Sequence, residues 1–201
     1  LKPINLKEKI DAKGEFPPLE KINNDILRLR MAVYSPMQYV LPHKRADYSE
    51  KYDTKVANGR VFKQTDREHN LVYLMKSNLL KRLESSVHSF SLTLQNIIQQ
   101  IEEHIKKIDC YDESSGTIGE MDGIDAEDPE LEEALIGSKV KIFLKDMDLI
   151  RWKQDLLYDR EILLRLLHEA RNVTPDRDQK LLALKRLIEQ KIKHLINDQN
   201  K

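Results

Sequence analysis

The stretch N-L-L-K-R-L-E-S-S-V-H-S-F, residues 78–90, decides the fold of this chain, because it lies within a long amphipathic segment. Apolar residues recur here at steps of four and three, which places them on one stripe of a helix. No Pro or Gly occurs from Gln64 to Asp109, so the pattern predicts one continuous helix over 64–109. A helix of roughly 40 residues spans about 60 Å. The stripe consists of Leu83, Val87, Phe90, Leu94, Ile97 and Ile101.

The residues before this segment predict a shorter helix and a connector. Pro17-Pro18 is typical of a helix start, and Ser35-Pro36 of a helix end. Four Tyr occur in or beside the connector at 37–59. Packing of these rings on a helical core is about twice as common as a nucleic-acid surface, so a core role is the preferred interpretation. Thr65, with Glu68 three residues later, predicts a capping box at the start of the long helix.

The residues after it predict two more helices. Asp148 is a candidate N-cap, and a stripe through Trp152, Leu156 and Leu163 follows. A final helix is expected over about 175–196, joined to the previous one by a tight turn and therefore antiparallel to it. Residues 60–63 and 139–144 are at most short strands.

These patterns together predict an all-α fold. We expect long antiparallel helices in a helical hairpin or bundle, with an acidic loop and at most one minor strand pair. The expected divisions are an irregular arm at 1–17, the first helix and Tyr-rich connector at 18–63, the long helix at 64–109, an acidic flexible loop at 110–138 and a helical hairpin at 139–201.

The formal net charge of zero conceals an asymmetry. The window 109–133 contains no Lys or Arg, so the rest of the chain holds all 34 basic residues but only 23 of the 34 acidic ones. Such a basic body weakly favours a polyanionic partner. The single Cys110 excludes an internal disulfide and a cysteine-based zinc site, and no apolar run is long enough to span a membrane.

Four colinear blocks carry a resemblance to a known family. They are A-V-Y-S-P-M-Q-Y-V-L-P (32–42), M-K-S-N-L-L-K-R-L-E-S-S-V-H-S-F (75–90), K-D-M-D-L-I-R-W-K-Q-D-L-L-Y-D (145–159) and T-P-D-R-D-Q-K-L-L-A-L-K (174–185). The chain resembles, over about residues 22–201, the helical region between the two RecA-like lobes of bacterial SWI/SNF-type helicase-like ATPases. No block is itself a catalytic signature.

The resemblance implies a mechanical role. This region would couple lobe motion to DNA, and residues 139–201 would lead to the second motor lobe. The parent protein would be an ATP-dependent translocase in the bacterial cytoplasm, associated with the nucleoid. Its partners would be the motor lobes of the same parent chain and DNA, with binding of DNA by this chain alone weak or absent.

Candidate contacts to DNA or a lobe are Lys44, Arg45, Lys81, Arg82 and Glu84. For the last three, the competing interpretation is an exposed charged face whose residues pair locally.

The chain itself carries no phosphate-binding loop, so we expect no enzymatic activity and no cofactor here, with ATP and Mg²⁺ bound by the parent protein. The six His show no H-E-x-x-H spacing, and no metal site is predicted. One alternative is an independent coiled-coil module that dimerises through the stripe from Leu83 to Ile108. Another is an all-α enzyme with a site in the bundle, although the chain lacks the E-x-x-H pattern of such sites.

Overall fold

The computed structural model describes residues 9–55, 61–111, 120–121 and 140–193. Helices dominate this part of the chain, which confirms the all-α prediction. The helices are α1 (Leu19–Arg28), α2 (Arg45–Tyr52), α3 (Gln64–Ser85), α4 (Val87–Asp109), α6 (Leu149–Arg171) and α7 (Gln179–Lys193), with 3-10 turns at Ala32–Tyr34, Pro36–Tyr39, Pro42–Lys44 and Leu144–Asp146.

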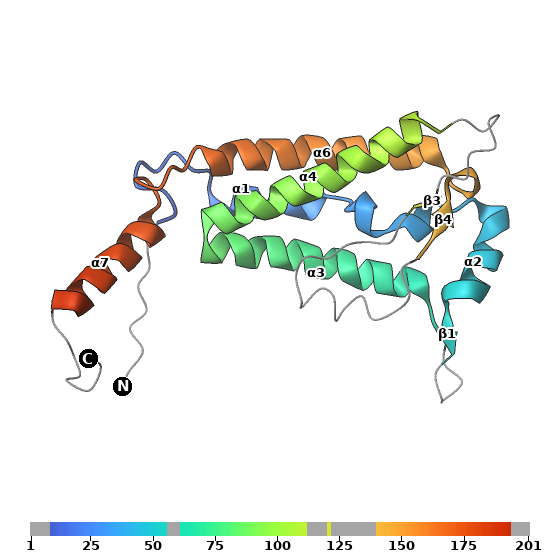
Figure 1. Cartoon of the computed structure of the whole chain (residues 1–201), viewed down its shortest axis with the longest axis horizontal. Coiled ribbons are helices and arrows are strands. Elements are labelled where there is room, and N and C mark those ends of the chain that lie inside the picture. Colours follow the sequence, from blue (N-terminus) through green and yellow to red (C-terminus); the bar gives the residue numbers. More distant parts are fainter. Residues whose placement is uncertain (1–8, 56–60, 112–119, 122–139, 194–201) are drawn as a thin grey trace.

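Four helices form the body of the molecule. Helix α4 packs against both α3 and α6, and α1 lies against α3 and α6, which closes the bundle (Figure 1). The apolar stripe of α4 is buried in this core, and Phe90 and Leu94 are fully inaccessible. Trp152, Leu156 and Leu163 of α6 belong to the same core, as the sequence predicts. Asp148 caps α6 as expected, because its carboxylate accepts the backbone N–H of Arg151 at 3.0 Å.

The prediction of one continuous helix over 64–109 is wrong. The chain breaks at Ser86, whose backbone is extended (φ −160°, ψ 132°), and α3 and α4 fold back on each other as a hairpin (Figure 1). The Ser86 hydroxyl accepts the backbone N–H of Ser89 at 3.4 Å and so caps α4. The break turns both halves of the predicted stripe toward one core, because Leu79 and Leu83 of α3 are buried as well as the stripe of α4.

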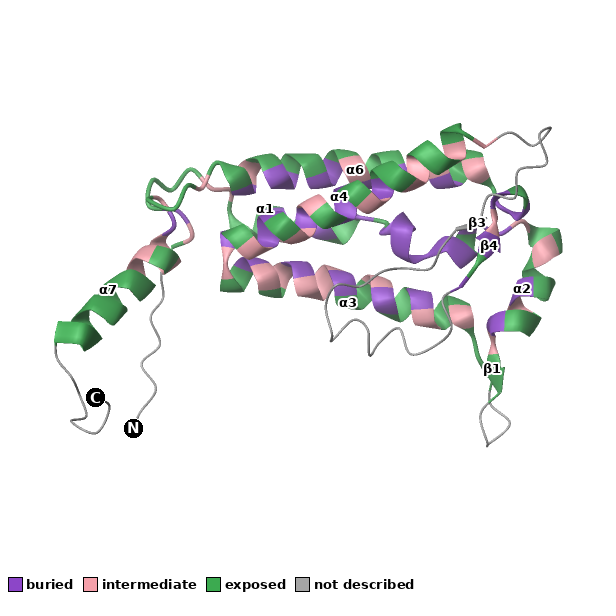
Figure 2. Cartoon of the chain, viewed as in Figure 1, coloured by how far each residue is buried: buried purple, intermediate pink, exposed green. Residues whose placement is uncertain are grey.

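The segment 29–41 runs through the centre of the bundle and is called the central segment here. It is buried over most of its length (Figure 2), and it separates α1 from α2. The first helix therefore ends at Arg28, earlier than the Ser35-Pro36 end predicted. The connector contains α2 and the 3-10 turn Pro42–Lys44. The tyrosines in or beside it, Tyr34, Tyr39, Tyr48 and Tyr52, are buried, which agrees with a packing role.

The capping box predicted at Thr65 does not form. Helix α3 begins at Gln64 with Lys63 as its N-cap, and no side chain caps it. Glu68 instead points into the core and binds the backbone of Met37. Glu68 binds Met37 rather than the start of α3 because the Met37 amide is buried and requires an acceptor.

The predicted hairpin of the last two helices is also absent. Figure 1 shows α7 leaving the end of the bundle rather than returning along α6. No residue of α7 is buried over 179–193. Residues 172–179 after α6 are hydrogen-bonded to the N-terminal arm, residues 9–16, instead.

The strands are short, as expected, but the described residues contain two antiparallel pairs rather than one. β1 (Thr54–Lys55) pairs with β2 (Val61–Phe62), and β3 (Glu120–Met121) pairs with β4 (Ile142–Phe143). Most of the predicted acidic loop, 112–119 and 122–138, lies outside the described residues. Within the part of the chain that is described, no helix is both long and apolar enough to cross a membrane.

Candidate functional site

The five predicted contact residues fall into two groups at opposite ends of the bundle. Lys44 and Arg45 lie where α2 begins, and Lys81, Arg82 and Glu84 lie in the last turns of α3 (Figure 1). Helix α3 separates them, and its 22 residues span about 33 Å. The structure therefore does not bring the five residues together into one site.

The first group is engaged in local contacts. The Lys44 Nζ lies 3.6 Å from a carboxylate oxygen of Asp47, and Arg45 Nε donates to the carbonyl of Val40 at 3.1 Å. These interactions fix the corner between the central segment and α2. The geometry favours a structural role for both cations over a free phosphate-binding surface.

The second group adjoins α7. The ammonium group of Lys180, in the first turn of α7, donates a hydrogen bond to the backbone carbonyl of Glu84. Lys81 and Glu84 are exposed and Arg82 is half-buried, so these charges border the base of α7 on the surface. Helix α7 adds five further basic residues, Lys180, Lys185, Arg186, Lys191 and Lys193, against one acid, Glu189. The basic residues of α7, together with Lys81 and Arg82 of α3, are called the basic corner here.

Helix α7 also exposes an apolar stripe. Leu184 is 54% exposed and Ile188 is 50% exposed, and neighbouring apolar residues at helical spacing extend the stripe. The rest of the stripe consists of Leu181 and Ile192. Exposed apolar residues on one helical face mark a surface that a partner can cover. The sequence predicts that this helix runs antiparallel to α6, whereas the structure leaves its apolar stripe exposed.

A buried carboxylate network that the sequence patterns did not predict lies between α6 and the central segment. Asp159 of α6 is inaccessible to solvent, and its two oxygens accept the backbone N–H groups of Arg30 (2.6 Å) and Ala32 (2.9 Å). Asp155, one turn earlier, accepts from the Tyr39 hydroxyl at 2.8 Å and binds the Arg30 guanidinium. Together these carboxylates fasten the central segment to α6.

Burial changes the acidity of several groups in this core. It raises the pKa of Asp159 to about 6 and that of Glu68 to about 8, in both cases against the effect of the backbone N–H donors. Burial also lowers the pKa of His104 to about 4; the ring of this histidine lies 5.4 Å from that of Trp152. The oxygens of Asp155 and Asp159 are occupied by donors from the central segment, so the network serves as a fastener rather than as acid–base machinery.

The sequence does contain a signal for this network. Asp155 and Asp159 are spaced by four and lie within the apolar stripe of α6, next to Trp152 and Leu156. A charged residue inside such a stripe is rarely buried unless it is paired. That rule could have identified both aspartates as partners of a buried backbone segment.

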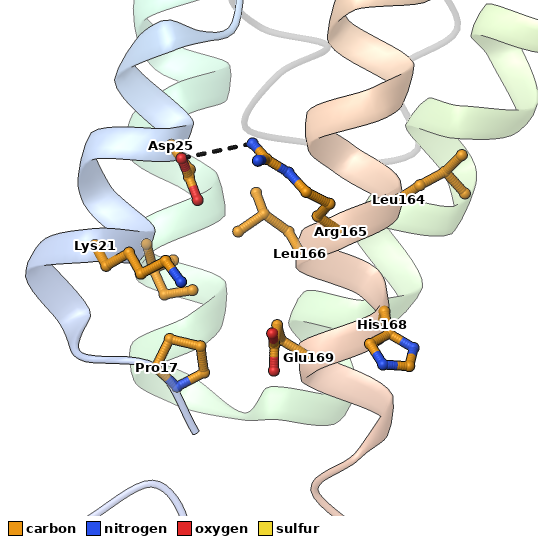
Figure 3. Close-up of a pocket in the computed structure, with 9 residues that line it drawn as sticks. Pro17, Lys21, Asp25, Leu164, Arg165, Leu166, His168 and Glu169 are labelled. Atoms are coloured by element: carbon orange, nitrogen blue, oxygen red, sulfur yellow. Dashed lines mark ion pairs between the residues drawn. The ribbon is translucent and has the colours of Figure 1, made fainter. Parts of the chain in front are cut away.

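An open cavity of about 330 Å³ lies between α1 and α6 (Figure 3). Its walls carry charges of both signs, Lys21 and Arg165 against Asp25 and Glu169. Asp25 and Arg165 form an ion pair of 3.7 Å across it. This balance gives the cavity no preference for an ion of either sign. No group of three or more potential metal-ligating side chains occurs among the described residues.

Comparison with known proteins adds no relative. No family model, no curated protein and no solved structure matches this chain. The residues and the geometry described above therefore carry the functional proposal.

Proposed function

We propose that this chain is the helical region between the two RecA-like lobes of a bacterial SWI/SNF-type helicase-like ATPase, where it couples lobe motion to DNA. The proposal draws on the four colinear sequence blocks that resemble that family. In this role ATP and Mg²⁺ bind to the motor lobes, and this chain contributes rigidity and surface contacts. The parent protein would act in the cytoplasm, associated with the nucleoid.

One structural observation carries the proposal furthest. The N-terminal arm and the turn before α7 lie side by side, since the Ala12 N–H donates to the carbonyl of Arg177 at 2.8 Å. A helical body inserted between two domains needs its incoming and outgoing segments close together, so that it projects as one unit. The bundle meets this requirement, and its buried core gives it the stiffness that a mechanical element needs.

The basic corner suits the proposed role. Cations on α3 and α7 can contact phosphates without reading bases, which matches an enzyme that moves along DNA of any sequence. Lys81 and Arg82 are the sequence-predicted residues that fit this surface. Lys44 and Arg45 lie at the opposite end of the bundle, at the start of α2, and are not part of this surface.

The decisive test is the coding sequence on both sides of this chain. A phosphate-binding loop upstream and a second RecA-like lobe downstream are expected, and a neighbourhood with neither would overturn the proposal. In the parent protein, Arg82→Ala should lower DNA-stimulated ATP hydrolysis more than it lowers the thermal stability of this chain. Arg45→Ala, at the other end of the bundle, is the matched control and should not lower the coupling.

The second candidate is an independent protein-interaction module, and the exposed stripe of α7 favours it. The stripe first predicted for dimerisation is buried within the chain from Leu83 to Ile101, and its α4 part lies where α4 packs against α6. We therefore expect a dimer, if this candidate holds, to form through the exposed stripe of α7. Sedimentation of the chain with and without Ile188→Glu separates the candidates, because a monomer in both cases argues against dimerisation.

A further inference from the structure

Two segments far apart in sequence form one junction at the base of α7. Residues 9–16 of the arm meet residues 172–178 of the turn after α6, and Asp11 and Asp178 form an antiparallel bridge. On one side of the bridge Ala12 N–H donates to the Arg177 carbonyl at 2.8 Å, and on the other Gln179 N–H donates to the Ile10 carbonyl at 3.3 Å. The arm therefore pairs, in the manner of a short antiparallel strand, with the turn from which α7 begins.

A buried ion pair locks this junction. Arg177 binds Asp11 with both ends of its guanidinium, Nε to Oδ1 at 3.0 Å and Nη2 to Oδ2 at 2.7 Å. The Asp11 side chain is 1% exposed and that of Arg177 is 14% exposed. Hydrogen bonding to Arg177 holds the pKa of Asp11 well below its usual range. Bidentate pairs of this kind fix orientation as well as proximity.

Backbone groups of the arm itself hold the Asp11 carboxylate in place. The Asp11 oxygens also accept the backbone N–H groups of Lys13, Glu15 and Phe16, at 2.8 to 3.1 Å. Gly14 has φ +69°, a left-handed conformation that glycine adopts freely, and it closes the turn around the carboxylate. The backbone of the arm thus holds the Asp11 carboxylate in place for the guanidinium of Arg177.

Helix α7 starts directly from the junction. Asp178 caps it, because its side chain accepts the backbone N–H of Leu181 at 3.0 Å. No residue of α7 is buried over 179–193, so little of the bundle core contributes to its direction. The orientation of α7 is therefore set largely where residue 178 is fixed, at the arm.

We infer that the Asp11–Arg177 pair is a clamp that joins the N-terminal arm to α7 and holds α7 at a fixed orientation to the bundle, whereas the fold of the bundle does not depend on the clamp. When the clamp opens, α7 is released while the bundle stays folded. In the proposed ATPase, a displacement of the arm would pass directly to α7 without deforming the bundle. That last consequence rests on the proposed function, whereas the clamp itself does not.

The experiment measures distances between spin labels in the whole chain. Cys110 is exposed at the end of α4 and supplies one label site. A second label at Glu189→Cys reports on α7, and in a separate sample one at Arg171→Cys, at the end of α6, reports on the bundle. With the clamp intact, both distance distributions should be narrow. Arg177→Ala should broaden the α7 distribution and leave the bundle distribution narrow.

Two controls assign the effect. Lys180→Ala removes the contact of α7 with Glu84, and Arg160→Ala removes the 3.1 Å ion pair between Arg160 and Glu102 that joins α6 to α4. Both should leave the α7 distribution narrow, and Asp11→Asn should reproduce the broadening seen with Arg177→Ala. An unchanged α7 distribution in Arg177→Ala, or broadening of the bundle distribution as well, overturns the inference. The absence of a phosphate-binding loop beside this chain would overturn the proposed function but not the clamp.

Discussion

Glu68 on α3 accepts the backbone N–H of Met37 with both of its carboxylate oxygens, at 3.0 and 3.3 Å. The side chain sits in the core, with only 2% of the residue exposed, and burial raises its pKa to about 8. The folded state therefore holds a proton that the unfolded state releases at a lower pH. The stabilisation from this proton is complete below the ordinary pKa of a glutamate and is lost as the pH rises through about 8.

Replacing Glu68 by Gln should flatten the dependence of stability on pH. Glutamine keeps an oxygen for the Met37 amide and cannot ionise, so the free energy of unfolding should fall less from pH 6 to pH 8 than in the wild type. Asp159 contributes in the same direction, but its pKa of about 6 places most of its effect below this window. Urea titrations followed by circular dichroism at several pH values measure the slope. Glu161→Gln, at an exposed position of α6, should leave the slope unchanged. Equal slopes in the wild type and Glu68→Gln would show that Glu68 is ionised throughout.

Phe90 is the aromatic anchor of α4, and it is fully inaccessible to solvent. Phe90→Ala should lower the free energy of unfolding by about 3–5 kcal/mol, because it removes the ring and leaves a cavity between α4 and its neighbours. Leu92→Ala on the same helix is the matched control, since Leu92 is 46% exposed, and its cost should be much smaller. A decrease below about 1 kcal/mol for Phe90→Ala would mean that the core relaxes around the missing ring.

The parts of the fold that local periodicity determines are predictable from the sequence. The stripe of α4, the core residues of α6 and the Asp148 cap follow from spacing alone, and the structure confirms them. The same rules fail where a tertiary partner competes with a local one. Glu68 leaves its predicted cap for a buried amide, and Asp155 and Asp159 fasten a segment more than 100 residues away in sequence.

The candidate site is less predictable than the fold. Sequence spacing assigns Lys44 and Arg45 the same role as Lys81 and Arg82, but position along a chain does not reveal that α3 holds the two groups apart. The Asp11–Arg177 pair links residues near the two ends of the sequence, and no local pattern marks it. Such long-range polar contacts depend on which backbone groups the fold buries, so they become visible only in three dimensions.

Binding of duplex DNA should be weak, salt-dependent and localised at the basic corner. The double variant Lys81→Gln/Arg82→Gln should weaken binding and reduce the slope of log affinity against log salt by about 0.9 for each phosphate that is no longer neutralised. Lys44→Gln/Arg45→Gln removes the same formal charge at the opposite end of the bundle and should have the smaller effect, since both residues lie away from the basic residues of α7. Fluorescence anisotropy at several salt concentrations measures both. Equal weakening by the two variants would indicate an effect of net charge rather than a surface at the corner.

Ser86 should control the hairpin between α3 and α4. The sequence around it favours helix, yet the structure places Ser86 in extended backbone, with its hydroxyl capping α4. Ser86→Ala removes that cap and should lower the free energy of unfolding by about 0.5–2 kcal/mol. Ser85→Ala, in the last position of α3, should be neutral or slightly stabilising, because alanine has the higher helix propensity and Ser85 is exposed.

The same pair of variants tests why the long helix is broken. If the core determines the turn, Ser86→Ala should lower stability while the spin-label distance between Cys110 and Ser77→Cys on α3 stays that of a folded hairpin. Burial of Leu79, Leu83, Phe90 and Leu94 in one core far outweighs a single cap. A shift of that distance to the length of one straight helix would show instead that Ser86 alone decides between the hairpin and the continuous helix that local periodicity predicts.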